Sequence, residues 1–231
     1  MNRSKIANLP QVLQDDIDYL KGKANESGAA CWGDGEDARL VGFKRLVKDI
    51  YYYEQSRRCC YCSIELQPNN KTKDLEHVID KSGRPDLMFE LRNLAVSCTT
   101  CNGGKKKKRV LIEGCAEEGF PCDSKFYMHI HPHFDEWSDH LFFDEYLRVV
   151  PRKDSSKGES TYSICNFNRL NAMRLCDFFD GGRASAEKLI RSYFEVSTLR
   201  AKKQRLDLLR DIANKSNNAK AKLIVSLLEQ G

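Results

Sequence analysis

Apolar residues recur at helical spacing in two segments near the start of the chain, at 10–25 and 37–53. Residues three and four positions apart share one face of a helix, so each segment predicts an amphipathic helix. The residues on the two apolar faces are Leu13, Ile17, Leu20, Leu40, Phe43, Val47 and Ile50. The glycine-containing stretch 28–35 predicts a loop between the two helices.

The pattern changes in the middle of the chain. Segments 74–80 and 93–97 mix polar and apolar residues with β-branched ones and predict two short strands, and 99–102 begins a predicted lysine-rich helix. From 110 to 160, Pro121, Pro132 and Pro151 interrupt the periodicity, so we expect short strands and loops there. Residues 154–158 predict an exposed turn.

Helical spacing returns from Cys165 to the C-terminus. These helices could complete the core, form a homo-oligomer or present a helix to a partner protein, and the pattern does not choose among the three. The predicted fold class is therefore α+β. It has four regions: a helical N-terminal region (1–57), a core with the candidate chemistry (58–110), an irregular or β insert (111–164) and a helical C-terminal region (165–231).

Two Cys-x-x-Cys pairs bracket the central segment, Cys59 with Cys62 and Cys98 with Cys101. Two such pairs supply the four thiolates that tetrahedral Zn²⁺ prefers, and a closed four-sulfur shell leaves no open position for a substrate. We therefore expect a structural zinc ion, which contributes folding free energy on the order of 10 kcal/mol. The alternative is a set of reduced core cysteines. Cys60 offers a third thiol beside the first pair, and we interpret it as a bystander.

Between and after these pairs stand the dyad Glu76-His77, the asparagines Asn93 and Asn102, and Lys105. In this order and with these gaps, the segment resembles the HNH endonucleases, also called the ββα-metal nucleases. The resemblance covers about a quarter of the chain. It implies two strands and a helix around a catalytic cation, beside the structural zinc, and a metal-dependent endonuclease that hydrolyses DNA phosphodiester bonds.

The chemistry of this reaction needs an activated water and a cation that neutralises charge on the phosphoryl oxygens. A neutral histidine with an ordinary pKa of about 6.5 suits proton removal from water, so we expect His77 to be the general base. Glu76 and Asn102 are oxygen donors that suit Mg²⁺ or Mn²⁺. By resemblance to the family, Asn93 holds the His77 loop through its amide and Lys105 contacts a phosphate.

Two positions depart from the commonest family pattern. The first acidic position is more often Asp, where this chain has Glu76, and the last position is often His, where it has Asn102. Both departures bear on which cation the site prefers more than on whether it hydrolyses DNA. The alternative function is a zinc-stabilised nucleic-acid-binding or regulatory subunit without cleavage activity of its own.

The formal net charge is +5, and the positive charges are unevenly distributed. Five consecutive cations directly follow the candidate site: Lys105, Lys106, Lys107, Lys108 and Arg109. Consecutive cationic side chains on a short helix neutralise phosphates and release counterions. We therefore expect this run to contact DNA.

No apolar run reaches the roughly 18 residues of a membrane-spanning helix, and the N-terminal residues do not form a secretory signal. The cysteines outside the two pairs lack the spacing of a disulfide framework, so we expect a protein of the reducing cytoplasm. Cys115 and Cys122, with His129 or His131, form an alternative second metal site. We instead interpret His129, His131 and His133, which alternate along a predicted strand, as solvent-exposed side chains.

Further residues narrow the resemblance. The runs Glu76–Lys81 and Asn93–Cys98, followed by the segment Pro132–Trp137 and a helical tail, are similar to the nuclease subunit of two-component antiphage systems such as Septu. That similarity implies a role in antiviral defence and an ABC-type ATPase partner. The chain has no Walker phosphate loop, so control by nucleotide hydrolysis must come from such a partner.

Overall fold

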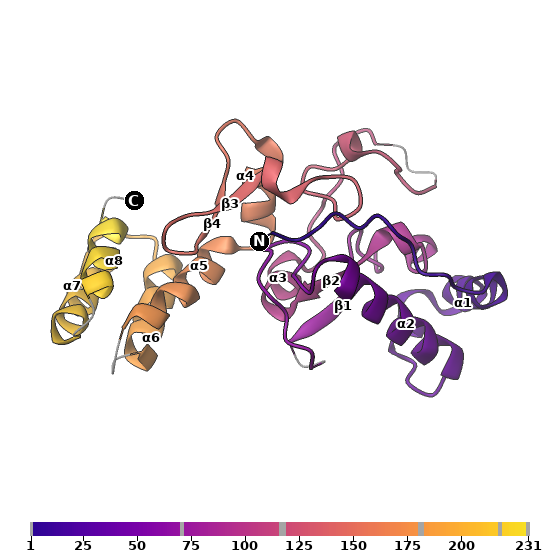
Figure 1. Cartoon of the computed structure of the whole chain (residues 1–231), viewed down its shortest axis with the longest axis horizontal. Helices are drawn as coiled ribbons and strands as arrows, with labels where there is room; N and C mark the ends of the chain where they lie inside the picture. Colours follow the sequence, from indigo (N-terminus) through magenta and orange to yellow (C-terminus); the bar gives the residue numbers. More distant parts are fainter. Residues whose placement is uncertain (1, 70–71, 116–118, 180–182, 217–218, 230–231) are drawn as a thin grey trace. The chain divides into compact units, whose positions relative to one another are not determined.

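The computed structural model describes residues 2–69, 72–115, 119–179, 183–216 and 219–229, apart from the side chains of Asp177, Arg183 and Leu227. This part of the chain combines helices with short antiparallel strands, which confirms the predicted α+β class (Figure 1). The chain forms two compact units. Unit 1 comprises residues 1–142 and 150–165, and unit 2 comprises 143–149 and 166–231. Within the described residues, no helix is both long enough and apolar enough to span a membrane.

Unit 1 begins with the two predicted helices, α1 (Gln14–Ser27) and α2 (Ala38–Glu54). The carboxylate of Asp37 accepts a hydrogen bond from the backbone N–H of Leu40, which satisfies one of the free N–H groups at the start of α2. The predicted loop between the helices contains a 3-10 helix, η1 (Gly28–Gly33). The buried face of α2 packs against the strands that follow.

Strands β1 (Lys73–His77) and β2 (Leu94–Cys98) form an antiparallel hairpin, with Glu76 opposite Ala95 and His77 opposite Leu94. The first strand ends three residues earlier than predicted. Asp80 explains this end, because its carboxylate accepts hydrogen bonds from two backbone N–H groups of the turn that follows.

Helix α3 (Thr99–Lys105) follows β2 directly, so the chain runs from strand to strand to helix in this part of unit 1 (Figure 1). The expectation that the whole basic run lies on this helix is wrong, because Lys106 has a φ of 49° and the helix ends before it. Gly103 and Gly104 also weaken the last turn, since each glycine costs about 1 kcal/mol relative to alanine in a helix. The side chains after Lys105 therefore project from an irregular segment.

The rest of unit 1 consists of short elements, as predicted. Strands β3 (Leu141–Phe143) and β4 (Val149–Pro151) carry the chain out of unit 1 and back again. The predicted turn at 154–158 is instead partly helical, because Ser155 caps the start of α4 (Ser156–Ile164) by accepting a hydrogen bond from the N–H of Gly158. The remaining 3-10 helices of this unit are η2 (Pro85–Leu87), η3 (Leu91–Asn93), η4 (Ser124–Phe126) and η5 (Trp137–Asp139).

Unit 2 is helical, as predicted from Cys165 onward. Its elements are α5 (Phe167–Leu175), η6 (Cys176–Phe178), α6 (Arg183–Glu195), α7 (Leu199–Lys215) and α8 (Ala219–Glu229). Ile190, Leu209 and Ile224 are fully buried in a core that these helices form among themselves. The helices therefore bury most of their apolar faces within unit 2, whereas Leu199 stays 86% exposed.

Candidate metal centre and active site

The four predicted zinc ligands come together in unit 1. Cys59 and Cys62 lie in the turn after α2, Cys98 ends β2, and Cys101 lies in the first turn of α3. Their sulfur atoms all lie within 4.8 Å of one another. Cys59 Sγ accepts a hydrogen bond from the N–H of Cys98 at 3.2 Å, and Cys98 Sγ accepts one from the N–H of Cys101 at 3.4 Å. This cluster can hold a metal ion such as zinc.

Burial and hydrogen bonds between the thiols shift the pKa values of the cluster cysteines in different directions. Burial favours the neutral thiol and raises the pKa values of Cys62 and Cys101. Burial acts on Cys59 in the same way, but hydrogen bonds from the neighbouring thiols outweigh it and lower its pKa well below the ordinary value. Cys60 is buried but is not a member of the cluster. Cys165, which the sequence patterns did not indicate, comes from the end of α4 and hydrogen-bonds to Cys101.

Glu76 lies in a buried ion pair. Its Oε1 is 2.8 Å from Nζ of Lys105, and both side chains are almost completely buried, at 4% and 1% exposed. The hydroxyl of Tyr61 donates a hydrogen bond to the same oxygen at 3.2 Å, and Lys105 also donates to the backbone carbonyl of His77 at 2.8 Å. Burial raises the pKa of Glu76, and the adjacent ammonium of Lys105 opposes that shift. Lys105 therefore faces Glu76 rather than solvent.

His77 lies on the opposite side of β1 from Glu76, as strand alternation requires. Its Nε2 is 3.1 Å from the backbone carbonyl of Met88, and its ring makes a T-shaped contact with Trp32 at a centroid distance of 4.4 Å. A carbonyl only accepts hydrogen bonds, so Nε2 carries the proton and Nδ1 keeps the lone pair. Burial, followed by the charge of Lys81, lowers the pKa of His77 to about 3.

The two predicted asparagines hold neighbouring parts of the hairpin. The side chain of Asn93 accepts a hydrogen bond from the N–H of Ile79 at 2.7 Å and donates to its carbonyl at 3.1 Å and to that of Leu87 at 3.0 Å. It thereby fixes the backbone just after His77. On α3, Asn102 donates to the carboxylate of Asp74 at 2.9 Å. Asp74 was missed in the sequence, although it shares a strand face with Glu76.

The predicted site residues thus lie on one hairpin and one helix, but their side chains make two separate sets of contacts. The side chains of Glu76 and Asp74 both contact α3, whereas that of His77 contacts η1 and the carbonyl of Met88. Among the residues that the structure describes, the cysteine cluster is the one close group of three or more metal-ligating side chains. The alternative metal site at Cys115 and Cys122 is therefore not found there.

The expectation of solvent-exposed histidines at 129–133 is wrong. His129 and His131 are fully buried, and His133 is 8% exposed with its Nε2 2.8 Å from the carbonyl of Leu94. Both ring nitrogens of His129, and Nε2 of His131, have no hydrogen-bond partner among the described atoms. The physical reason is aromatic packing, because the ring of His131 stacks on Phe134 at 4.2 Å.

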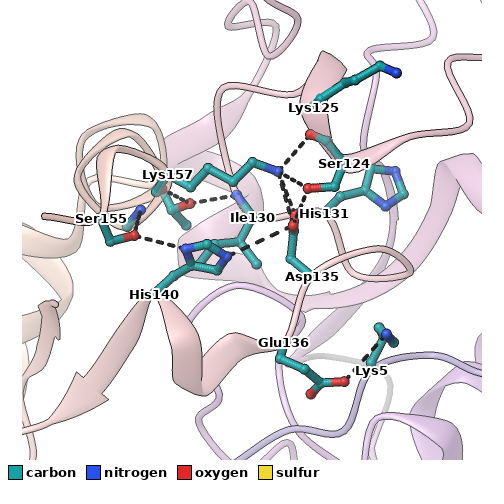
Figure 2. Close-up of polar contacts among 12 residues, drawn as sticks. Lys5, Ser124, Lys125, Ile130, His131, Asp135, Glu136, His140, Ser155 and Lys157 are labelled. Atoms are coloured by element: carbon teal, nitrogen blue, oxygen red, sulfur yellow. Dashed lines mark hydrogen bonds and ion pairs between the residues drawn. The ribbon is translucent and has the colours of Figure 1, made fainter.

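A polar network supports this histidine segment (Figure 2). Nζ of Lys157 lies 2.9 Å from Oδ2 of Asp135, and Ser124 donates to Oδ1 of the same carboxylate at 2.5 Å. Asp135 also accepts a hydrogen bond from the backbone N–H of His131 at 2.7 Å. Nearby, Trp137 donates through its indole N–H to the carbonyl of Tyr61 at 2.7 Å. The segment is therefore attached directly to the turn that carries Cys59 and Cys62.

The four cations after Lys105 are exposed. Lys108 donates to the carbonyl of Ile164 at 2.8 Å, and Arg109 donates to the carbonyl of Leu111 at 3.0 Å. These partners are neutral, so the positive charges of this segment are not compensated by them. A role of these residues in nucleic-acid binding stays a prediction.

No protein-family model matches the chain. Over 169 residues, or 73% of its length, the chain is 27% identical to the Septu protein PtuB of Bacillus thuringiensis. The matched part covers 55% of that relative, so the chain spans little more than half of its length. This similarity agrees with the resemblance to Septu-like systems that the sequence motifs indicated. The name of the relative does not mention an HNH site.

Proposed function

We propose that the chain is a metal-dependent endonuclease of the HNH type, which hydrolyses DNA phosphodiester bonds in antiphage defence together with an ABC-type ATPase. The similarity to Septu protein PtuB supports the defence role. The observation that carries the nuclease assignment is the state of His77, which stands at the end of β1 with one tautomer fixed by the carbonyl of Met88.

His77 is proposed as the general base. Its lowered pKa keeps the imidazole neutral at physiological pH, and the bond from Nε2 leaves Nδ1 as the atom that accepts a proton from water. Asn93 positions the backbone that follows His77 by holding both polar groups of Ile79. A base with so low a pKa is weak, and a nearby phosphate would raise its pKa by stabilising the imidazolium.

Glu76 and Asn102 are the residues proposed to hold the catalytic Mg²⁺ or Mn²⁺, and Asp74 is a third oxygen donor on the same side of β1. These donors are hard ligands of the kind that such cations prefer. A divalent cation there would stabilise the charge that develops on the phosphoryl oxygens. In the structure Oε1 of Glu76 is paired with Lys105, so a second cation there would compete with that ammonium for the carboxylate.

The buried ion pair also favours a second candidate function. A protein without cleavage activity would retain such a pair of residues, because the carboxylate of Glu76 is neutralised by Lys105 and His77 is only 6% exposed. In that case the chain is a zinc-stabilised nucleic-acid-binding or regulatory subunit. The two candidates differ in one observable property, metal-dependent cleavage that requires His77.

The test is plasmid cleavage by the zinc-loaded protein with Mg²⁺ or Mn²⁺, alone and with a co-expressed ATPase partner. His77→Ala should lower the cleavage rate by about 10²–10⁴-fold, the usual contribution of a general base. His140→Ala is the matched control, because His140 belongs to unit 1 but lies outside the hairpin and α3. Equal rates for His77→Ala and the native protein would refute the nuclease assignment. No cleavage by the native protein under either condition would favour the second candidate.

A further inference from the structure

A cavity of about 340 Å³ in unit 1 is lined by two segments, one that follows strand β1 and one that follows helix α3. One segment, 79–84, begins two residues after His77, and the other, 107–115, begins two residues after the end of α3. The cavity is separate from the cysteine cluster and shares no lining residue with the Glu76–Lys105 pair.

The cavity carries a strong excess of positive charge. Its charged lining residues are Arg84, Lys107, Lys108, Arg109 and Asp80, so four positive charges and one negative charge give a net +3. Asp80 is already used by its own turn, where it accepts hydrogen bonds from the N–H groups of Ser82 and Gly83. An anion would therefore be attracted to this cavity.

These cations differ in how far other groups already engage them. Arg84 pairs with Asp86 through two bonds, Nε to Oδ1 at 2.8 Å and Nη2 to Oδ2 at 2.6 Å, and its Nη2 also donates to the carbonyl of Gly119 at 3.0 Å. Lys108 donates to the carbonyl of Ile164, outside the lining, whereas Arg109 donates to the carbonyl of Leu111 in the cavity wall. The exposed side chains of Lys107 and Arg109 therefore carry the charge that a ligand in the cavity would meet.

Another part of the lining is apolar. Ile79 and Val110 are buried, and Leu111 and Ile112 continue the same wall. A site for a bare inorganic anion needs no such wall, because an apolar surface contributes nothing to binding a hydrated ion. Cations beside an apolar wall instead match a molecule with a phosphate at one end and a ring at the other.

We propose that this cavity binds one unpaired nucleotide of a nucleic-acid strand, with the phosphate at Lys107 and Arg109 and the base or sugar against the wall of Ile79 and Ile112. The inference rests on the proposed function, since it names the form in which that substrate is held. In a duplex the bases are paired and stacked, so a base reaches such a wall only when it is unpaired. The volume is near the lower end of the roughly 300–1,000 Å³ of small-molecule sites, which suits a single nucleotide.

The test is fluorescence anisotropy with a labelled oligothymidylate and with a labelled duplex of equal length, in the His77→Ala protein so that nothing is cleaved. Lys107→Gln should weaken binding of the single strand about tenfold and lower its salt slope by about 0.7. Lys153→Gln is the matched control, because it removes an exposed positive charge from unit 1 away from the cavity. Equal effects of the two variants would overturn the proposal.

A second pair of variants separates a nucleotide cavity from a merely charged surface. Ile112 is 41% exposed, so Ile112→Lys and Ile112→Ser should both fold. Ile112→Lys adds a positive charge but removes the apolar contact, so the cavity predicts weaker binding of the single strand, whereas a charged surface predicts tighter binding. Unchanged binding in Ile112→Ser, or tighter binding in Ile112→Lys, would overturn the proposal. So would a duplex that loses as much affinity as the single strand.

Competition identifies the part of the ligand that the cavity recognises. Adenosine monophosphate should displace the oligothymidylate from the native cavity at lower concentration than inorganic phosphate does, because it offers both a phosphate and a base. Equal potency of the two competitors would overturn the proposal. Since all of these measurements are of binding, failure of His77→Ala to affect cleavage would refute the nuclease assignment and leave the cavity result intact.

Discussion

The cysteine cluster and the Glu76–His77 dyad stand on the same hairpin, yet their buried polar atoms are satisfied in different ways. Glu76 has a positive partner in Lys105, and His77 has the carbonyl of Met88. The four cysteine sulfurs instead face one another within 4.8 Å. Four thiolates buried together are unfavourable without a cation. We therefore expect the cluster to depend on an added cation for stability, whereas the dyad has its partners within the protein.

The cysteine cluster is therefore a candidate folding element, and the dyad is a candidate reactive site. A metal ion held by the cluster would join the turn after α2 to the end of β2 and to α3, and would fix the frame on which both sets of residues stand. Within that frame, Oε1 of Glu76 and Nε2 of His77 already have partners in the protein. We therefore expect the two sites to differ in their dependence on an external partner.

The largest effect is expected at the cluster. Cys98→Ser should abolish metal binding and lower the free energy of unfolding of unit 1 by up to about 10 kcal/mol, because it removes one of four ligands. Elemental analysis measures the zinc content. Tryptophan fluorescence in denaturant measures the stability of unit 1, because Trp32 and Trp137 both lie there.

Cys60→Ser is the matched control for that variant. Cys60 is fully buried, whereas Cys98 is partly exposed, and Cys60 is not a member of the cluster. Its replacement should therefore cost about 1 kcal/mol and leave the zinc content unchanged. Full zinc occupancy in Cys98→Ser, or loss of zinc in Cys60→Ser, would show that the ligand set has been assigned incorrectly.

A smaller effect is expected at the dyad. Lys105→Met leaves the carboxylate of Glu76 buried without its counter-charge and should lower the free energy of unfolding by about 3–5 kcal/mol. The double variant with Glu76→Gln should recover most of that stability, since both charges are then gone. Lys106→Met, at an exposed neighbouring position, should change stability by less than about 0.5 kcal/mol. A double variant no more stable than Lys105→Met would mean that the ion pair is not the cause.

The cysteine cluster was the part of the site most accessible to sequence analysis, because two residues between cysteines place both thiols on one turn whatever the rest of the fold does. The α1, α2 and β2 segments followed from periodicity for the same local reason. The partner of Glu76 did not, since Lys105 is 29 positions away and its charge predicts an exposed side chain. Trp32 escaped prediction because only tertiary packing brings η1 to His77.

The histidines at 129–133 were assigned incorrectly for a related reason. Their alternation with an isoleucine and a proline fits an exposed strand as well as a buried segment. The choice depends on contacts with α2 and β2, which are distant in sequence: the ring of Tyr51 lies 5.3 Å from that of His133, and the carbonyl of Leu94 lies 2.8 Å from its Nε2. Asp74 could have been found, because residues two apart on a strand share a face and Glu76 was already identified.

Because the histidines at 129–133 are buried, we expect unit 1 to lose stability in acid. Burial lowers the pKa of His131 well below its ordinary value, and the charges of Lys157 and Arg3 act in the same direction. A lowered pKa in the folded state means that stability is fully present above about pH 6.5 and falls as the unfolded chain takes up protons below it, by about 1.4 kcal/mol per pH unit for each such group.

His131→Phe should make the stability of unit 1 less dependent on pH, because it keeps an aromatic ring and removes the titrating group. Between about pH 6.5 and pH 5 the native protein should lose about 2 kcal/mol more than the variant, measured by denaturant unfolding with tryptophan fluorescence. His140→Phe is the control, since His140 is partly exposed and its pKa is lowered less strongly. Identical pH profiles for the native protein and His131→Phe would contradict the assignment.

The smallest effect is expected for the exposed residues of the basic run, which differ in this respect from the buried Lys105. Lys106 and Lys107 are exposed, so reversing both charges to glutamate should leave folding nearly unchanged and lower the salt slope of DNA binding by about 0.9 for each phosphate that is no longer neutralised. Arg200→Glu with Lys203→Glu on α7 makes the same change in net charge in unit 2. Equal decreases of slope in the two double variants would assign the effect to overall charge. A decrease confined to Lys106 and Lys107 would place DNA beside α3, and would separate these lysines from Lys105, whose charge is already committed to Glu76.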